Sequence, residues 1–266
     1  MPARESEALV LRAYPYREAD LIVSFFARDR GKLRGIAKGV RRPKSRFGSG
    51  LERLAHSRLS YFQKQTVELV RIDRSELVGP PLLLRTDYPS SVALDFVAEV
   101  AEYLLPEHEP NDAYFRLLIM MLEEIWNELS ANPPGGDGVP AKLWRALTYF
   151  SLWSLRLGGW MPPLDVCIET GRELEPRETA YYQPSEPGLL SAEAAGREAR
   201  KLAADSRVLA ARMLRLPLPA FDDGEWSAGT AVDLRQFLFQ RLEANLERRL
   251  TTLSLLRSFD RVAPSV

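Results

Sequence analysis

The residues of this chain whose types and spacing suggest chemistry are nine Lys and Arg side chains between residues 28 and 46, with Asp29 as the one acid among them. Clustered cations bind phosphate backbones, because each phosphate that they neutralise releases a condensed counterion. Gly35 and Gly39 interrupt the run, and residues without a side chain let a nucleic-acid strand approach the backbone. The run therefore predicts a nucleic-acid contact, with a solvated or disordered connection as the open alternative.

Seven cations and two aromatic side chains form the predicted contact set. The cations would meet phosphates, and the rings would stack on bases, at about 1–3 kcal/mol for each base. The set comprises Lys32, Arg34, Lys38, Arg41, Arg42, Lys44 and Arg46, with Phe47 and Tyr61 as the stacking residues. For the two aromatic residues, a place in the hydrophobic core is the alternative.

We find no catalytic motif in the sequence. The stretch "GKLRGIAKG" has glycines and lysines but lacks the spacing of a nucleotide-binding loop, which argues against an ATPase. His56 and His108 belong to no ligand or nucleophile pattern, and Cys167 has no base matched to it by spacing. We expect no enzymatic activity, no cofactor and no bound metal.

Composition indicates a folded protein of a reducing compartment. The 266 residues, 45% of them hydrophobic, suffice for a sizeable core and for two domains. The single cysteine excludes an internal disulfide. Neither a signal peptide nor a membrane-spanning window is present, so we expect a cytoplasmic protein without membrane contact.

Charge is divided between two regions of a chain that is neutral as a whole. Residues 1–79 carry 17 Lys and Arg against 9 Asp and Glu, whereas residues 80–266 carry 19 against 27. The acidic remainder would confine a polyanion to the N-terminal region.

Short strands are expected to position the basic run. Alternating apolar residues and turn signals predict about five strands between residues 8 and 75, with Gly31 in a tight hairpin that needs a positive φ. Such a series of strands is typical of an OB-fold barrel, which we assign to residues 1–79. Helical periodicity then begins after a Pro-rich break, and it predicts a helical domain over residues 80–266, interrupted by an irregular segment at 159–192. The fold class is therefore α+β.

The segment "EADLIVSFFARDRGKLRGIAKGVRRPKSRF" resembles the N-terminal signature of RecO, a family of bacterial recombination mediators. The family's A-K-G-x-R-R-x-K-S run is matched with the same spacing from Ala37 to Ser45. The stretches "LRLGGWMPPLDVCIETG" and "RRLTTLSLLRSF" are similar to the family's segment around C-x-x-C-G and to its closing helix. These anchors are spread over nearly the full length of the chain.

The resemblance implies an OB-fold joined to a helical domain that binds single- and double-stranded DNA and anneals complementary strands without ATP. The implied partners are RecR, the C-terminal tail of single-stranded-DNA-binding protein and, indirectly, RecA, which would be loaded onto DNA. It also implies a cytoplasmic, nucleoid-associated protein that acts in DNA damage repair and homologous recombination.

Many members of this family carry four cysteines that bind zinc. At the corresponding positions, or near them, this chain has Cys167, Thr170, Ser191 and Ala194. One thiolate cannot build a four-coordinate zinc site, so we expect a degenerate, zinc-less version of this zinc-finger-like segment. Apolar packing and hydrogen bonds would hold it instead, with three candidate residues, Tyr181, Tyr182 and Leu189.

Two other interpretations stay open on the residues alone. An OB-fold RNA-binding module would explain the basic run but not the long acidic helical region. A helical interaction scaffold, whose barrel makes only protein contacts, would show no salt-sensitive binding to nucleic acid.

Overall fold

The computed structural model describes residues 3–43, 45–63, 68–80, 86–131, 138–221, 226–227 and 229–260. The chain forms two compact units, Met1–Gly135 and Gly136–Val266. The first unit contains the five strands of the barrel and also two helices. It therefore ends later than the predicted domain boundary at residue 79, which stays a prediction. No helix of the described residues has the length and apolar character that crossing a membrane requires.

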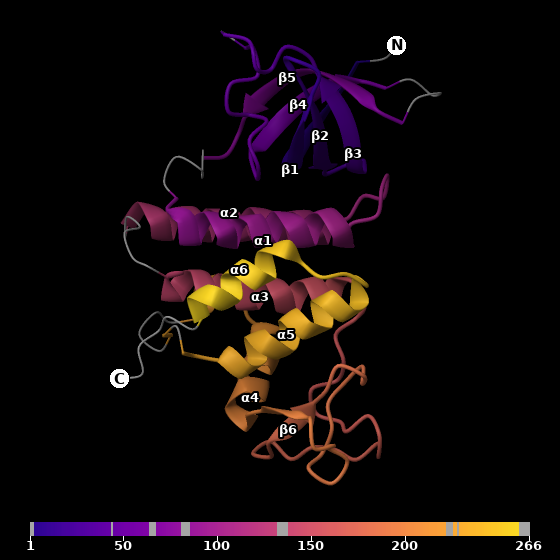
Figure 1. Cartoon of the computed structure of the whole chain (residues 1–266), viewed down its shortest axis with the longest axis vertical. Helices are drawn as coiled ribbons and strands as arrows, with labels where there is room; N and C mark the ends of the chain where they lie inside the picture. The colour runs from indigo at the N-terminus through magenta and orange to yellow at the C-terminus, as the bar shows by residue number, and fades with distance from the viewer. Residues whose placement is uncertain are drawn as a thin grey trace. The chain divides into compact units, whose positions relative to one another are not determined.

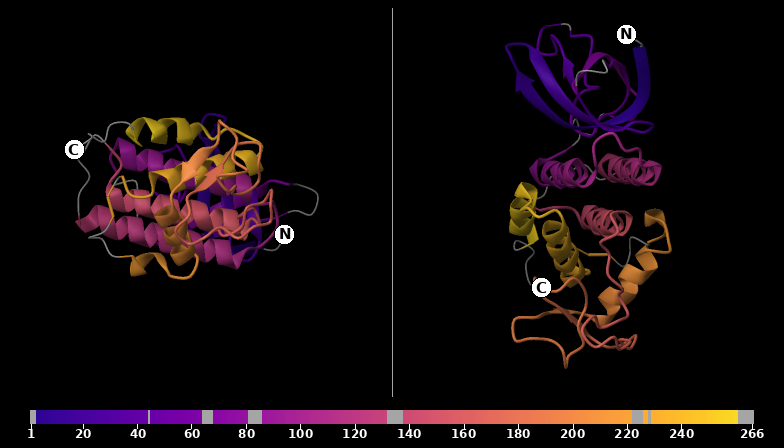
Figure 2. Two further views of the ribbon diagram at one scale, coloured as in Figure 1. Left: turned by 90° about the horizontal axis from the view of Figure 1, so that it is seen from below. Right: turned by 90° about the vertical axis from the view of Figure 1, so that its right-hand side faces the viewer.

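Five strands close into a barrel in the order β1-β2-β3-β5-β4, which confirms the predicted five-stranded architecture (Figure 1). The strands are β1 (Ala3–Tyr16), β2 (Asp20–Ala27), β3 (Gly31–Ala37), β4 (His56–Phe62) and β5 (Val70–Leu77). The β3–β5 pair is parallel and every other pair is antiparallel. The right-hand view in Figure 2 shows the strongly curved strands wrapping around the core.

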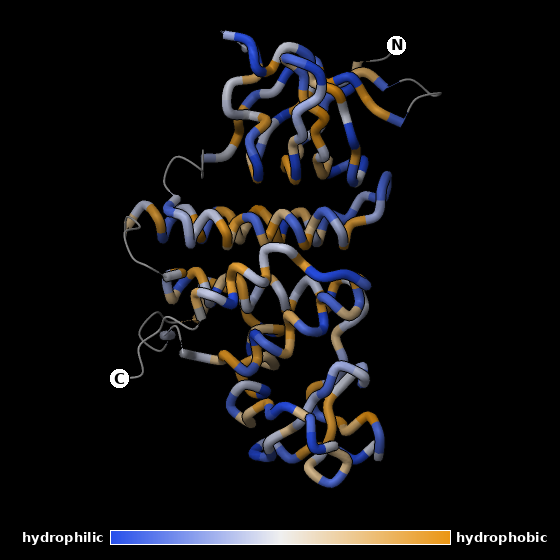
Figure 3. Tube along the Cα trace, viewed as in Figure 1, coloured by the Kyte–Doolittle hydropathy of each residue, from blue (hydrophilic) through white to orange (hydrophobic). Residues whose placement is uncertain are grey.

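The barrel closes because β1 pairs with two neighbouring strands. Its first half pairs with β4 and its second half with β2, and the register shifts between Val10 and Arg12. Such an irregularity bends a strand and increases its twist. Apolar and polar residues alternate along the strands (Figure 3), and the apolar set, including Val23, Phe25 and Ile72, is buried inside. This period of two follows from the opposite directions of successive side chains.

Two helices, α1 (Tyr88–Leu104) and α2 (Asp112–Ala131), complete the first unit. Asp87 caps α1 by accepting a hydrogen bond from the Ser90 amide at 2.9 Å, and the helix buries Phe96 and Val97. The loop between α1 and α2 meets the β2–β3 hairpin, where the amide of His108 donates to the carbonyl oxygen of Lys32 at 3.0 Å. The barrel is thus fixed to α1 and α2 at this hairpin.

The second unit is mainly helical. Its elements are α3 (Ala141–Leu157), β6 (Ala180–Tyr182), β7 (Arg200–Leu202), α4 (Ala204–Met213), η2 (Leu218–Ala220), α5 (Val232–Asn245) and α6 (Thr251–Asp260). Helix α5 buries Leu234, Phe237 and Leu238, and the ring of Phe237 meets the ring of Tyr182 edge to face at 5.1 Å.

Backbone hydrogen bonds and buried side chains hold the irregular segment at residues 159–192. The amide of Cys167 donates to Arg172 O at 2.8 Å, and the amide of Ile168 donates to Leu189 O at 2.9 Å. Of the predicted packing residues, Tyr182 and Leu189 are buried, and Tyr181 is half-buried. Among the described residues, no three His, Cys, Asp or Glu side chains gather where they could hold a metal ion.

Arg207 of α4 fastens this segment from one side. Its buried guanidinium donates four hydrogen bonds to backbone carbonyl groups, over distances of 2.7–3.1 Å. The acceptors are the carbonyl oxygens of Leu164, Leu174, Glu175 and Glu178. Because a guanidinium has five donors in a fixed fork, a single side chain can bridge several turns of the segment.

Cys167 is fully buried in the same segment. Burial raises the pKa of its thiol, but hydrogen bonds from the Thr170 side chain and the Ser191 backbone outweigh burial and lower the pKa to about 6. A thiolate reacts only where a reagent can reach it. We expect Ellman's reagent to label native protein more slowly than urea-unfolded protein, by a factor on the order of 100. Equal rates would show that the segment is open in the native state.

Candidate nucleic-acid interface

The first half of the basic run is neutralised by acidic side chains of the same unit. Arg28 donates to Asp112 Oδ1 at 2.7 Å and to Glu7 Oε2 at 3.1 Å. Arg34 lies on the exposed side of β3 and forms an ion pair of 3.1 Å with Glu107. These cations lie at the β2–β3 hairpin, where the barrel meets α1 and α2, so much of their charge is balanced locally.

Lys32 was predicted to contact a phosphate, but this prediction is wrong. The residue is only 6% exposed and is not available to a phosphate. Its Nζ donates to the carbonyl oxygen of Glu102, and the Glu102 carboxylate accepts a hydrogen bond of 2.6 Å from Ser24 Oγ. Burial lowers the pKa of Lys32, while the charge of Glu102 opposes that shift. Lys32 therefore fastens β3 to α1, and we leave it out of the contact set.

Two glycines of the run are explained by packing. Gly31 has φ of +74°, as predicted for the hairpin, and a side chain there would collide with the backbone of Glu109. Gly35 was expected to face a nucleic acid, but a Cβ there would lie 2.8 Å from side-chain atoms of Val70 and Ile72. Gly35 is therefore required by the close approach of β3 to β5.

The second half of the run forms an ordered turn, residues 38–43, which we call the basic turn. Gly39 has φ of +73°, and its amide donates to Asp20 Oδ1 at 2.8 Å. The amide of Arg41 donates to Ala19 O at 3.1 Å. Both hydrogen bonds fasten the turn to the β1–β2 hairpin, so the cations extend from a fixed backbone.

Three cations of the basic turn, Lys38, Arg41 and Arg42, are exposed, and no acidic side chain of the described residues pairs with them. Arg46 is also exposed but pairs with Asp73 at 3.3 Å. Lys44 lies outside the described residues. Among the described residues of the basic run, the exposed cations without an acidic partner are thus gathered in one turn at the end of the barrel.

The two predicted stacking residues lie in the barrel core, which corrects that expectation. The Tyr61 ring meets the Phe25 ring edge to face at 5.7 Å, and its hydroxyl lies 3.1 Å from Ser6 Oγ. Phe47 is also buried in this core. A ring enclosed by the barrel cannot stack on a base, so we leave both residues out of the contact set.

Two exposed tyrosines on β1 were not included in the predicted contact set. Tyr14 is 39% exposed, Tyr16 is partly exposed, and both lie next to the hairpin that fastens the basic turn. The stretch "LRAYPYRE" contains the pattern that could have identified them. Arg12, Tyr14 and Tyr16 are two residues apart, which places them on the same face of a strand.

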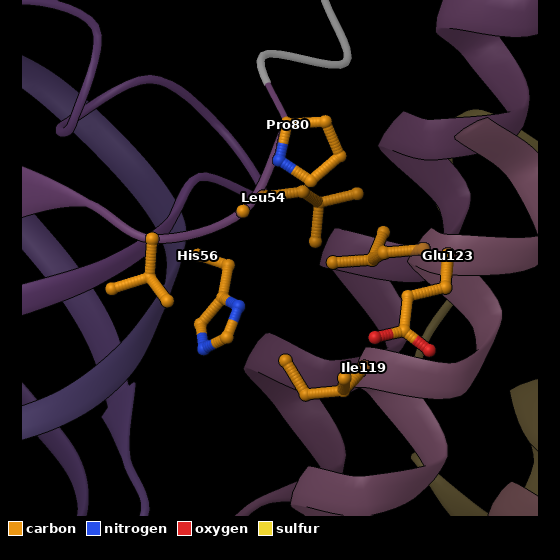
Figure 4. Close-up of a pocket in the computed structure, with 8 residues that line it drawn as sticks. Leu54, His56, Pro80, Ile119 and Glu123 are labelled. Atoms are coloured by element: carbon orange, nitrogen blue, oxygen red, sulfur yellow. The ribbon is translucent and has the colours of Figure 1, made fainter. Parts of the chain in front are cut away.

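A pocket of about 230 Å³ lies between the barrel and α2, with His56 on the barrel side and Glu123 on the helix side (Figure 4). His56 Nε2 lies 2.8 Å from Glu7 Oε1, and the imidazole ring packs edge to face on Phe115. These contacts give His56 a structural role, and most of the other residues that line the pocket are apolar.

Comparison with known proteins extends over almost the whole chain. Residues 1–81 match the family model for recombination protein O N terminal, and residues 85–254 match that for recombination protein O C terminal. The DNA repair protein RecO of Koribacter versatilis (strain Ellin345) is 41% identical over 257 residues, which cover 97% of this chain and 99% of that protein. The DNA repair protein RecO of Anaeromyxobacter sp. (strain K) is 31% identical, over 96% and 95% of the two chains.

Proposed function

The chain belongs to the RecO family of DNA repair and recombination proteins, and we propose that its basic turn binds single- and double-stranded DNA and promotes annealing of complementary strands without ATP. Members of this family are recombination mediators rather than enzymes. The observation that carries the proposal is the group of exposed cations at Lys38, Arg41 and Arg42 on a barrel, for which the described residues supply no acidic partner. Membership of the RecO family also favours DNA binding over the two alternatives, an RNA-binding module and a helical interaction scaffold.

Annealing without ATP follows from electrostatics. Two single strands repel each other through their phosphates, and cations placed between the backbones reduce that repulsion. Base pairing then supplies the driving force, and no covalent bond is made or broken. Because hydrogen bonds to Ala19 and Asp20 hold the basic turn, its backbone does not have to be ordered when DNA binds.

The partners follow from the family rather than from a described contact. We propose that the protein acts with RecR to load RecA onto DNA coated by single-stranded-DNA-binding protein. We expect the C-terminal tail of that protein to bind the helical region.

An annealing assay tests the proposed function. Two complementary oligonucleotides, one carrying a fluorophore and the other a quencher, should pair about 10-fold faster or more with the protein than without it, because the cations offset backbone repulsion. The acceleration should need no nucleotide and should fade as salt is raised. An unchanged annealing rate at low salt would contradict the proposal, and a non-complementary pair is the control.

A further inference from the structure

A row of partly exposed apolar side chains crosses the outer face of the barrel beside the basic turn. Tyr14 of β1 pairs with Ile22 of β2, and Ile22 pairs with Ile36 of β3. Tyr14 is exposed, and the two isoleucines are half-buried. A sheet face that meets only water normally carries polar residues at such positions. The row therefore suits a ligand with an apolar surface.

Two tyrosines on this face are held by arginines. The Arg12 guanidinium lies 4.7 Å from the ring centre of Tyr14, and that of Arg17 lies 5.2 Å from the ring centre of Tyr16. Arg12 also donates to the Tyr103 hydroxyl at 3.3 Å, which fixes its position. A cation–π contact holds a ring on one side and leaves its other side for a stacking partner. Residues two apart on a strand lie about 6.8 Å apart, so both rings can be used at once.

The tyrosines and the basic turn share one edge of the barrel. Tyr16 pairs with Asp20 across the β1–β2 hairpin, and Asp20 Oδ1 accepts the hydrogen bond from Gly39. The carbonyl oxygen of neighbouring Ala19 accepts the hydrogen bond from Arg41. An aromatic platform beside a cationic turn matches the two parts of a single strand, which are its bases and its phosphates.

On the basis of the proposed function, we propose that Tyr14 and Tyr16 stack on the bases of single-stranded DNA while its phosphates lie along the basic turn. A duplex keeps its bases stacked inside, so it can use the cations but not the rings. The tyrosines therefore give selectivity for single strands. Pairing of two strands removes their bases from the rings, which favours release of the annealed product.

The test compares two labelled oligomers of equal length and charge, oligo(dT) and an abasic oligomer of the same backbone. Wild-type protein should bind oligo(dT) more tightly than the abasic oligomer. The Y14A/Y16A variant should lose about 25-fold in affinity for oligo(dT), about 5-fold for each ring, and nothing for the abasic oligomer. Its salt dependence should equal that of the wild type, because no cation is removed.

Two variants control for side effects. Y14F/Y16F keeps both rings, so it should bind oligo(dT) like the wild type. Y88A removes an aromatic side chain that is 64% exposed on α1, and it should also leave binding unchanged. Wild-type affinity of Y14A/Y16A for oligo(dT) would overturn the inference and leave this face for a protein partner. A wild-type protein that binds neither oligomer would instead overturn the proposed function, and the inference with it.

Discussion

Alanine at Lys38, Arg41 and Arg42 is expected to weaken binding to single-stranded DNA about 100-fold at 0.1 M salt and to flatten the log–log salt dependence by about 2. Each cation that meets a phosphate contributes a slope of roughly −0.7, and three such contacts are removed. The three side chains are exposed without an acidic partner among the described residues, so their full charge is available to DNA. Fluorescence anisotropy of a labelled oligonucleotide over about 50–300 mM salt measures both quantities.

A second triple variant separates local contacts from total charge. R30A/R58A/R116A also removes three exposed cations, but each of them pairs with an acidic residue, Asp29, Glu5 or Asp112. We expect it to change the affinity less than about 10-fold and the slope by less than about 1. If this control weakened binding as much as the first variant, DNA would be bound by diffuse charge rather than by the basic turn.

The barrel could be predicted because its signals are local. Apolar side chains such as Val23 and Phe25 recur with the period of a strand, and Gly31 marks a hairpin that needs a positive φ. The same alternation distinguishes Tyr61, which shares the inner face with Leu59, from Phe62, which points to the outer face. The burial of Tyr61 was therefore within reach of the sequence once its strand was placed.

The division of the basic run could not be predicted, because it depends on residues distant in the chain. Lys32 and Lys38 look alike in the sequence, yet Lys32 is buried against Glu102, which is 70 positions away. Arg28 likewise meets Asp112, at a separation of 84. Charge density alone marks the whole run as a DNA contact, and the packing of α1 and α2 decides which cations remain available.

The guanidinium of Arg207 is the other feature whose removal should have a large effect. The R207A variant is expected to lose about 3–4 kcal/mol of unfolding free energy, because four backbone carbonyl groups lose the charged donor that the buried guanidinium supplies. A loss of this size corresponds to a melting temperature lower by roughly 10 °C in a chain of this length. Urea unfolding followed by circular dichroism, together with a thermal melt, measures the change.

The controls for Arg207 distinguish its hydrogen bonds from its charge. R207K keeps the positive charge but offers one compact donor group, which cannot span the carbonyl groups of Leu164 and Glu178, so it should recover less than half of the lost stability. R215A removes an exposed arginine just beyond the same helix and should change stability by less than about 0.5 kcal/mol. If R207A were as stable as R215A, the segment at residues 159–192 would be held by its apolar packing and its backbone hydrogen bonds without help from Arg207. A full rescue by lysine would mean that charge, rather than the fork of donors, holds the segment.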